Sequence, residues 1–203
     1  MKYLIVAITL ITIVCIATGC GRSCLEAQYS FNIQQTFYPE KDSISIGDTL
    51  FLESSHSTTL NDSTLNSLVD FSGSDMGGNL ELLRLPDTSS IATGGMDNFN
   101  IVFLTGKPSG NDNIPSQNKG CYFTESNNNY ELKIRFVAKQ KGIYLVSLGN
   151  AMGILKKKGG CEKANFLITN ANSNNHLYFY ANWLHSNAIS KYEKTHLYCF
   201  KVK

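Results

Sequence analysis

The sequence predicts a mainly β protein that folds as an antiparallel β-sandwich with one or two short helices. Two observations carry this prediction. Apolar and polar residues alternate along several short segments, as they do in strands with one buried face, and the clearest case runs from Tyr130 to Val137. The sequence also lacks the regular alternation of strand-like and helix-like segments that produces a parallel α/β sheet.

The expected strands follow one another along most of the chain. They are Tyr29 to Ile33, Ser43 to Ile46, Thr49 to Leu52, Leu80 to Leu85, Asn100 to Leu104, Tyr130 to Val137, Ile143 to Leu148, Asn165 to Thr169 and Leu197 to Val202. Gly47-Asp48 reads as a tight turn, and Gln140-Lys141-Gly142 predicts an antiparallel hairpin between the strands on either side of it. Short helices are expected within Leu60 to Val69 and within Leu184 to Glu193.

The N-terminal segment has the layout of a signal peptide. Met1-Lys2 is positive, Tyr3 to Ile16 is apolar, and the small residues Ala17-Thr18-Gly19 precede Cys20. The apolar core is shorter than the about 20 residues that a membrane-spanning helix needs. Ala17-Thr18-Gly19-Cys20 resembles a lipobox, and this resemblance implies that Cys20 becomes the lipidated N-terminus, with a diacylglycerol on its sulfur and an acyl chain on its amine. The alternative is ordinary secretion, with Cys20 available for a disulfide.

These features divide the chain into a signal peptide at 1–19, a lipidated tether at 20–27 and a single β-sandwich domain at 28–203. Several acyl chains together hold a protein stably at a membrane. Gly21 stands where an Asp would favour inner-membrane retention in many Gram-negative bacteria, so by resemblance we expect an outer-membrane anchor. The sequence leaves open whether the domain faces the cell surface or the periplasm.

The cysteines fit an exported protein with two disulfides. With Cys20 lipidated, an even set of four remains, which consists of Cys24, Cys121, Cys161 and Cys199. Their wide separation makes zinc ligation improbable. Three pairings are compatible with the spacing; we favour Cys161 with Cys199, because both flank the last apolar strands, which leaves Cys24 with Cys121.

Two segments resemble parts of bacterial immunoglobulin-like domains. Ile44 to Leu50 looks like an early strand pair with a Gly-Asp turn, and Phe136 to Tyr144 looks like a later hairpin. Together with the lipobox and Tyr198 to Val202, the chain resembles lipoproteins of the Bacteroidota that carry an immunoglobulin-like sandwich. The chain departs from the simple pattern between Ser54 and Asn98, where a long interval is inserted.

Three short segments resemble the O-glycosylation signal of Bacteroidota exported proteins. They are Asp42-Ser43-Ile44, Asp48-Thr49-Leu50 and Asp62-Ser63-Thr64. The same dipeptides are also ordinary turn and strand-entry pairs. We expect Asp62-Ser63-Thr64 to be the most exposed of the three.

The sequence predicts no catalytic residue, metal site, cofactor or nucleic-acid partner. It lacks the common motifs for serine hydrolases, zinc proteases and nucleotide binding. The four histidines, His56, His176, His185 and His196, lack metal-ligand spacing, so each is interpreted as structural. The formal net charge of +2 is small and the basic residues are scattered, which gives no indication of nucleic-acid binding.

An aromatic run near the C-terminus is the candidate binding region. It contains Tyr178, Tyr180 and Trp183 beside amide side chains, a mixture that suits sugar stacking or a protein interface. The alternative is that Leu177, Phe179 and Trp183 simply cover the core.

We therefore favour a lipid-anchored envelope protein that acts as a non-catalytic binding or assembly module. Its partners would be the membrane, through the anchor, and an envelope protein or glycan. Two alternatives stay open: an envelope hydrolase whose site is assembled from distant strands, since paired carboxylates need only spatial proximity, and a periplasm-facing inhibitor or structural lipoprotein.

Overall fold

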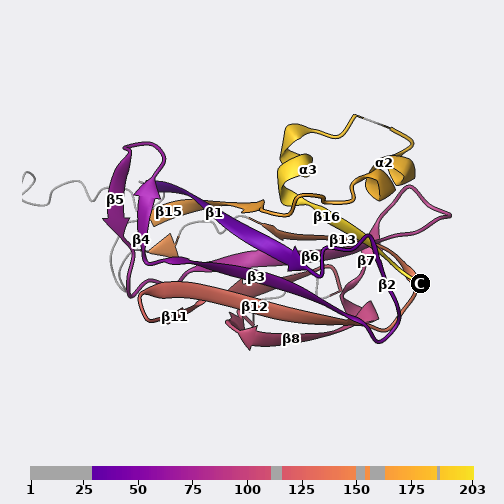
Figure 1. Ribbon diagram of the computed structural model, residues 1–203, viewed down its shortest axis with the longest axis horizontal. Coiled ribbons are helices and arrows are strands. Elements are labelled where there is room, and N and C mark those ends of the chain that lie inside the picture. Colours follow the sequence, from indigo (N-terminus) through magenta and orange to yellow (C-terminus); the bar gives the residue numbers. More distant parts are fainter. Residues whose placement is uncertain (1–28, 111–115, 150–153, 156–162, 187) are drawn as a thin grey trace, which may run out of the picture.

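The computed structural model describes residues 29–110, 116–149, 154–155, 163–186 and 188–203. The predicted signal peptide and tether lie outside these residues, and so do Cys20, Cys24 and Cys161. The described chain forms two β-sheets that pack face to face around a shared apolar core (Figure 1).

The first sheet has the strand order β11-β12-β3-β1-β15-β14, and β8 also pairs with β12. Its strands are β1 (Tyr29–Tyr38), β3 (Thr49–Ser57), β8 (Phe99–Thr105), β11 (Thr124–Ser126), β12 (Asn129–Ala138), β14 (Ile154–Leu155) and β15 (Lys163–Asn170). The longest pairing is antiparallel and joins β12 to β3 from Asn129↔Ser57 to Val137↔Thr49. The pairing of β1 with β15 is parallel.

The second sheet has the order β2-β16-β13-β6-β10-β9, and β7 also pairs with β6. Its strands are β2 (Ser43–Ile44), β6 (Gly77–Leu85), β7 (Thr93–Gly94), β9 (Lys107–Pro108), β10 (Asn118–Tyr122), β13 (Gly142–Gly149) and β16 (Tyr198–Val202). Here β16 and β2 run parallel, whereas the other pairings are antiparallel.

The remaining elements lie outside these two sheets. They are the hairpin of β4 (Thr59–Asp62) and β5 (Ser67–Asp70), the 3-10 helix η1 (Met96–Asn98), and the helices α2 (Tyr178–Leu184) and α3 (Lys191–His196). The hairpin lies at one end of the sandwich, while α2 lies toward the other end (Figure 1).

Alternation places one side of most strands in the core, as the sequence predicts. On β12, Tyr130, Leu132, Ile134 and Phe136 are almost fully buried, while the residues between them are partly exposed. On the opposite sheet, Tyr144 packs edge-on against Phe99 with 4.8 Å between ring centroids. Aromatic contacts of this kind add to the stabilisation that burial of apolar area provides.

The prediction of a mainly β sandwich with two short helices is confirmed. Every predicted strand is present, although several are longer or shorter than expected. The sandwich is not purely antiparallel, because the β1–β15 and β16–β2 pairs run parallel.

The predicted hairpin between the strands around Gln140-Lys141-Gly142 is wrong. β12 belongs to the first sheet and β13 to the second, so the turn carries the chain across the sandwich. The burial pattern gives the physical reason. β12 has one face toward solvent, whereas β13 is buried on both faces over Tyr144 to Leu148, and such a strand needs cover from two sides.

The helix predicted within Leu60 to Val69 is also wrong, because this segment forms the β4–β5 hairpin. Leu60 and Val69 face inward as a cross-strand pair, and Asn66 adopts a left-handed conformation (φ +49°) in the turn. The helix predicted within Leu184 to Glu193 is confirmed in part. α2 ends at Leu184 and α3 begins at Lys191, and the described residues between them are not helical.

Candidate functional site

Helix α2 covers the outer face of the second sheet and forms a second, smaller apolar cluster there. Its buried members are Leu85, Leu145, Leu197 and Cys199. Leu177, Phe179, Tyr180 and Trp183 pack against them from the helix and the residue before it. These side chains therefore cover an apolar cluster, but this cluster lies on the outer face of the second sheet and not in the core of the sandwich.

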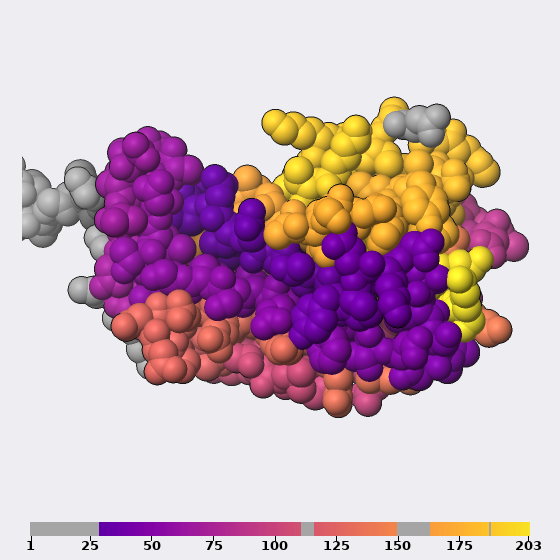
Figure 2. Space-filling view, viewed as in Figure 1, coloured from indigo at the N-terminus to yellow at the C-terminus, as the bar shows by residue number. Residues whose placement is uncertain are grey.

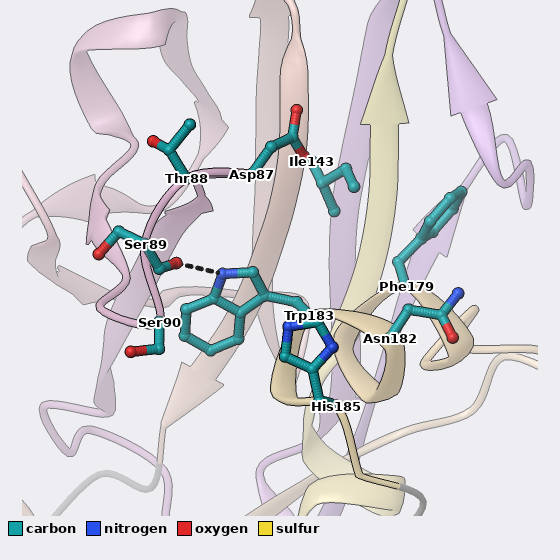
Figure 3. Close-up of a pocket in the computed structure, with 9 residues that line it drawn as sticks. All are labelled: Asp87, Thr88, Ser89, Ser90, Ile143, Phe179, Asn182, Trp183 and His185. Atoms are coloured by element: carbon teal, nitrogen blue, oxygen red, sulfur yellow. Dashed lines mark hydrogen bonds between the residues drawn. The ribbon is translucent and has the colours of Figure 1, made fainter.

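A cavity of about 460 Å³ opens between α2 and the loop that follows β6 (Figure 3). The loop contributes an acidic and three hydroxyl side chains, and the helix contributes aromatic, amide and imidazole groups. The lining residues are Asp87, Thr88, Ser89, Ser90, Ile143, Phe179, Asn182, Trp183 and His185.

Trp183 joins the two walls of this cavity. Its indole Nε1–H donates to the carbonyl oxygens of Pro86 (3.1 Å) and Ser89 (2.9 Å), and the Ser89 contact is drawn in Figure 3. On its other side the indole stacks on Tyr180, with 6.0 Å between ring centroids. The ring is thereby held in one orientation, and the loop is held against the helix.

A second cavity of about 480 Å³ adjoins the first and shares Asp87 and Ile143 with it. Its lining is rich in cations, with Arg84, Lys141, Lys201 and Lys203 among its members. We call the two cavities together the α2 groove. One part of the α2 groove presents an aromatic ring and hydroxyl groups, and the other part presents positive charge.

The structure separates the three aromatic residues that the sequence singles out. Trp183 lines the α2 groove, whereas Tyr180 donates its hydroxyl to Glu193 Oε1 of α3 (3.1 Å). Tyr178 is half exposed and donates to Asp42 Oδ2 (2.9 Å) at the edge of the sheet. The hydrogen bond from Tyr178 lowers the pKa of Asp42, and burial raises the pKa of Tyr180.

No sequence motif marks several of the residues that line the α2 groove. Thr88, Ser89 and Ser90 belong to a polar run after Pro86, whose composition indicates a loop but no site. His185 is exposed at the end of α2 in a left-handed conformation (φ +51°), and its position in the groove depends on the fold.

The described cysteines are deeply buried. Cys121 lies in the main core and Cys199 in the cluster under α2. Burial raises the pKa of each thiol to about 12. Within the described residues neither joins a disulfide. Since Cys24 and Cys161 lie outside these residues, the pairings of Cys161 with Cys199 and of Cys24 with Cys121 stay predictions, and so does the lipidation of Cys20.

The three O-glycosylation signals differ in exposure. Ser63 is exposed in the turn of the β4–β5 hairpin, whereas Thr49 and Ser43 are partly buried at the starts of strands. Ser63 Oγ donates to the Ser30 carbonyl (2.8 Å), and Asp62 is fully buried. Exposure therefore favours Ser63 of the three, as expected from the sequence, and its modification stays a prediction.

The histidines have different surroundings in the fold. His56 packs edge-on against Phe123, its Nε2 is 3.0 Å from Met76 Sδ, and burial lowers its pKa to about 4. His176 and His196 are buried, while His185 lines the α2 groove. In the part of the chain that the structure describes, no group of three or more His, Cys, Asp or Glu residues is arranged to hold a metal ion.

The described chain is thus a β-sandwich with a helix-walled groove on the outer face of its second sheet. No family model matches the sequence, and no curated protein matches it. Among solved structures, the chain is similar to the type II cohesin dyad of the adaptor ScaA scaffoldin of Acetivibrio cellulolyticus, with 10% identity and a TM-score of 0.35. That match covers 70% of this chain and 47% of the dyad, which is less than half of its length.

A second similar structure is the second type II cohesin module of the same scaffoldin, with 10% identity and a TM-score of 0.34. This match covers 70% of this chain and 94% of the module. Separately, none of the helices among the described residues has the length and apolar character to cross a membrane.

Proposed function

We propose that the protein is a lipid-anchored binding module of the bacterial cell envelope and that the α2 groove holds its ligand. The observation that carries this proposal is the groove itself, which is preformed on a rigid scaffold. Trp183 is fixed by two hydrogen bonds to the loop and by stacking on Tyr180. A site whose side chains are already ordered loses little conformational entropy when a ligand arrives.

The chemistry of the groove favours an acidic glycan chain as the ligand. Aromatic rings contact the apolar faces of sugar rings, while hydroxyl and amide groups bond to sugar hydroxyls. Trp183 supplies the ring, and Ser89, Ser90 and Asn182 supply polar groups around it. The adjoining cavity presents cationic side chains to the acidic groups of a chain that spans both parts. An acidic protein segment is the alternative ligand, and the titration described below distinguishes it from an acidic glycan.

The anchor belongs to the same proposal. Lipidation of Cys20 would hold the domain at the membrane, and we expect the outer membrane because Gly21 follows the cysteine. Metabolic labelling with radioactive palmitate tests this step. We expect label in the wild-type protein and none in Cys20→Ala; equal labelling of the two would refute lipidation at Cys20.

Intrinsic fluorescence tests the ligand site, since Trp183 is the one tryptophan of the sequence. We expect a saturable change in emission on titration with an acidic polysaccharide such as polygalacturonate, weaker at high salt, and a smaller change with a neutral glucan. Lys141→Gln should weaken the binding, whereas the matched control Lys107→Gln, on the distant strand β9, should not.

The same titration separates the alternatives. Saturation by poly-glutamate but by no polysaccharide would replace the glycan with an acidic protein segment. No change with either probe would refute the α2 groove as the ligand site, while the palmitate experiment would still decide on the anchor.

A further inference from the structure

The β4–β5 hairpin exposes two leucines at one end of the sandwich. The two strands form a separate sheet whose inner face contributes Leu60 and Val69 to the core. On the outer side and in the turn, Leu68 is 74% exposed and Leu65 is 63% exposed. Figure 2 shows this segment as a lobe at one end of the molecule, away from the α2–α3 layer.

The hairpin is fastened to the start of β1. The Ser30 N–H donates to Asp62 Oδ1 (3.1 Å), and the Ser63 N–H and Oγ both donate to the Ser30 carbonyl (2.8 Å each). The Asp62 Oδ1 also accepts from the Thr64 N–H (3.0 Å), which fixes the turn. The exposed leucines are therefore held at a defined position beside the point where β1 begins.

The sequence places the lipid close to this point. Eight residues separate Cys20 from Tyr29, the first residue of β1, and the nine Cα-to-Cα steps between them span about 30 Å at full extension. A lipid on Cys20 therefore keeps the hairpin end of the sandwich within about 30 Å of the bilayer surface. The opposite end, with the loop after β6 and α2, lies farther from the start of β1 (Figure 1).

We propose that the β4–β5 hairpin rests on the phospholipid bilayer that holds the anchor and inserts Leu65 and Leu68 into its interfacial region. This inference depends on the lipid anchor of the proposed function. Transfer of apolar side chains from water to the acyl-chain boundary is favourable. Because the anchor already holds the protein at the membrane, a contact beside the tether strengthens binding without a second loss of translational entropy. The contact orients the domain so that the α2 groove points away from the lipid.

Quenching by brominated lipids tests this contact in the full-length lipidated protein. The protein is reconstituted into vesicles of phosphatidylethanolamine and phosphatidylglycerol with bromine on the acyl chains. Leu68→Trp places a second indole on the hairpin, and Ile91→Trp places one in the loop after β6. Leu68 and Ile91 are matched, because both side chains are 74% exposed.

We expect loss of most of the emission that Leu68→Trp adds, and no loss of the emission that Ile91→Trp adds or of the Trp183 emission in the wild type. Flotation of each protein with the vesicles is measured in the same samples, with Cys20→Ala as the unanchored control. Equal quenching of Leu68→Trp and Ile91→Trp in proteins that float would overturn the hairpin contact and leave the anchor standing. Failure of the wild type to float would overturn the anchor and this inference with it.

Discussion

Tyr130→Phe removes a single hydroxyl that ties the main core to the segment between β5 and β6. The Tyr130 hydroxyl donates to the Phe71 carbonyl (2.6 Å) and accepts from the Ser74 N–H (3.0 Å), and Tyr130 is 1% exposed. Loss of the hydroxyl deprives the buried Phe71 carbonyl of this hydrogen bond, at about 1–3 kcal/mol, and removes the hydrogen bond from the Ser74 N–H, at about 1 kcal/mol. We expect a loss of about 3 kcal/mol in the free energy of unfolding, or about 6–12 °C in Tm for a domain of this size.

Thermal and urea denaturation followed by circular dichroism measure this loss, with Tyr144→Phe as the matched control. Tyr144 is also fully buried, but its hydroxyl donates to the Gln140 carbonyl (3.0 Å) in a partly buried turn, where water can replace it. The control should lose about 1 kcal/mol. If Tyr130→Phe lost no more stability than Tyr144→Phe, the argument that the buried hydrogen bonds of the Tyr130 hydroxyl stabilise the fold would be refuted.

The same residue predicts a dependence on alkaline pH. Burial raises the pKa of Tyr130 to about 12, above the ordinary value of about 10 for tyrosine. The pKa of Tyr130 is higher in the folded state than in the unfolded state, so folding favours the neutral side chain. The contribution of neutral Tyr130 to the free energy of unfolding is therefore complete below pH 10 and is lost as the pH rises from 10 to 12. The difference in the free energy of unfolding between the wild type and Tyr130→Phe should therefore narrow between pH 10 and pH 12. A difference that widens would contradict a raised pKa of Tyr130 in the folded state.

Three further predictions concern other parts of the fold. Alkylation of the folded protein at pH 8, in the presence of a reductant that opens any disulfide, should spare Cys121 and Cys199, because burial raises the pKa of each thiol to about 12, and rapid labelling in peptide mass spectra would contradict this. Ser190→Ala removes the hydroxyl that caps α3 and should cost about 1 kcal/mol in urea denaturation. Gly106→Ala should lower the free energy of unfolding by about 2 kcal/mol in the same assay, because φ is +87° and the added Cβ would lie 2.7 Å from the Tyr122 carbonyl oxygen. Unchanged stability would show that the backbone of this turn shifts to accept the Cβ.

The strands could be predicted from sequence because alternation is a local signal. Tyr130 to Val137 shows which residues are buried regardless of which strand lies beside them. The pairing of strands is not local. The turn at Gln140-Lys141-Gly142 has hairpin composition but crosses between sheets, since the outer cover of β13 comes from α2, more than thirty residues farther along the chain.

The helix predicted at Leu60 to Val69 shows the same limit on a smaller scale. Of its apolar residues only Leu60 and Val69 face inward, from two paired strands, and Asn66 adopts the left-handed conformation of the turn between these strands. For the site, the sequence singled out Trp183 by its chemistry. It could not place the loop of Ser89 and Ser90 opposite Trp183, because that approach depends on α2 packing against the second sheet.

Strand β6 separates the two surfaces that we propose for membrane contact and for ligand binding. β6 begins shortly after the β4–β5 hairpin and ends at the loop that contributes Asp87 to the α2 groove. Its nine residues span about 30 Å in extended conformation, so the two surfaces are separated by nearly the full length of one rigid strand. Because β6 is hydrogen-bonded to β13 and β10, this separation is fixed by the sheet rather than by a flexible linker. A protein anchored through Cys20 and resting on Leu65 and Leu68 would thus hold the groove at a constant height above the lipid, where an envelope glycan can reach it.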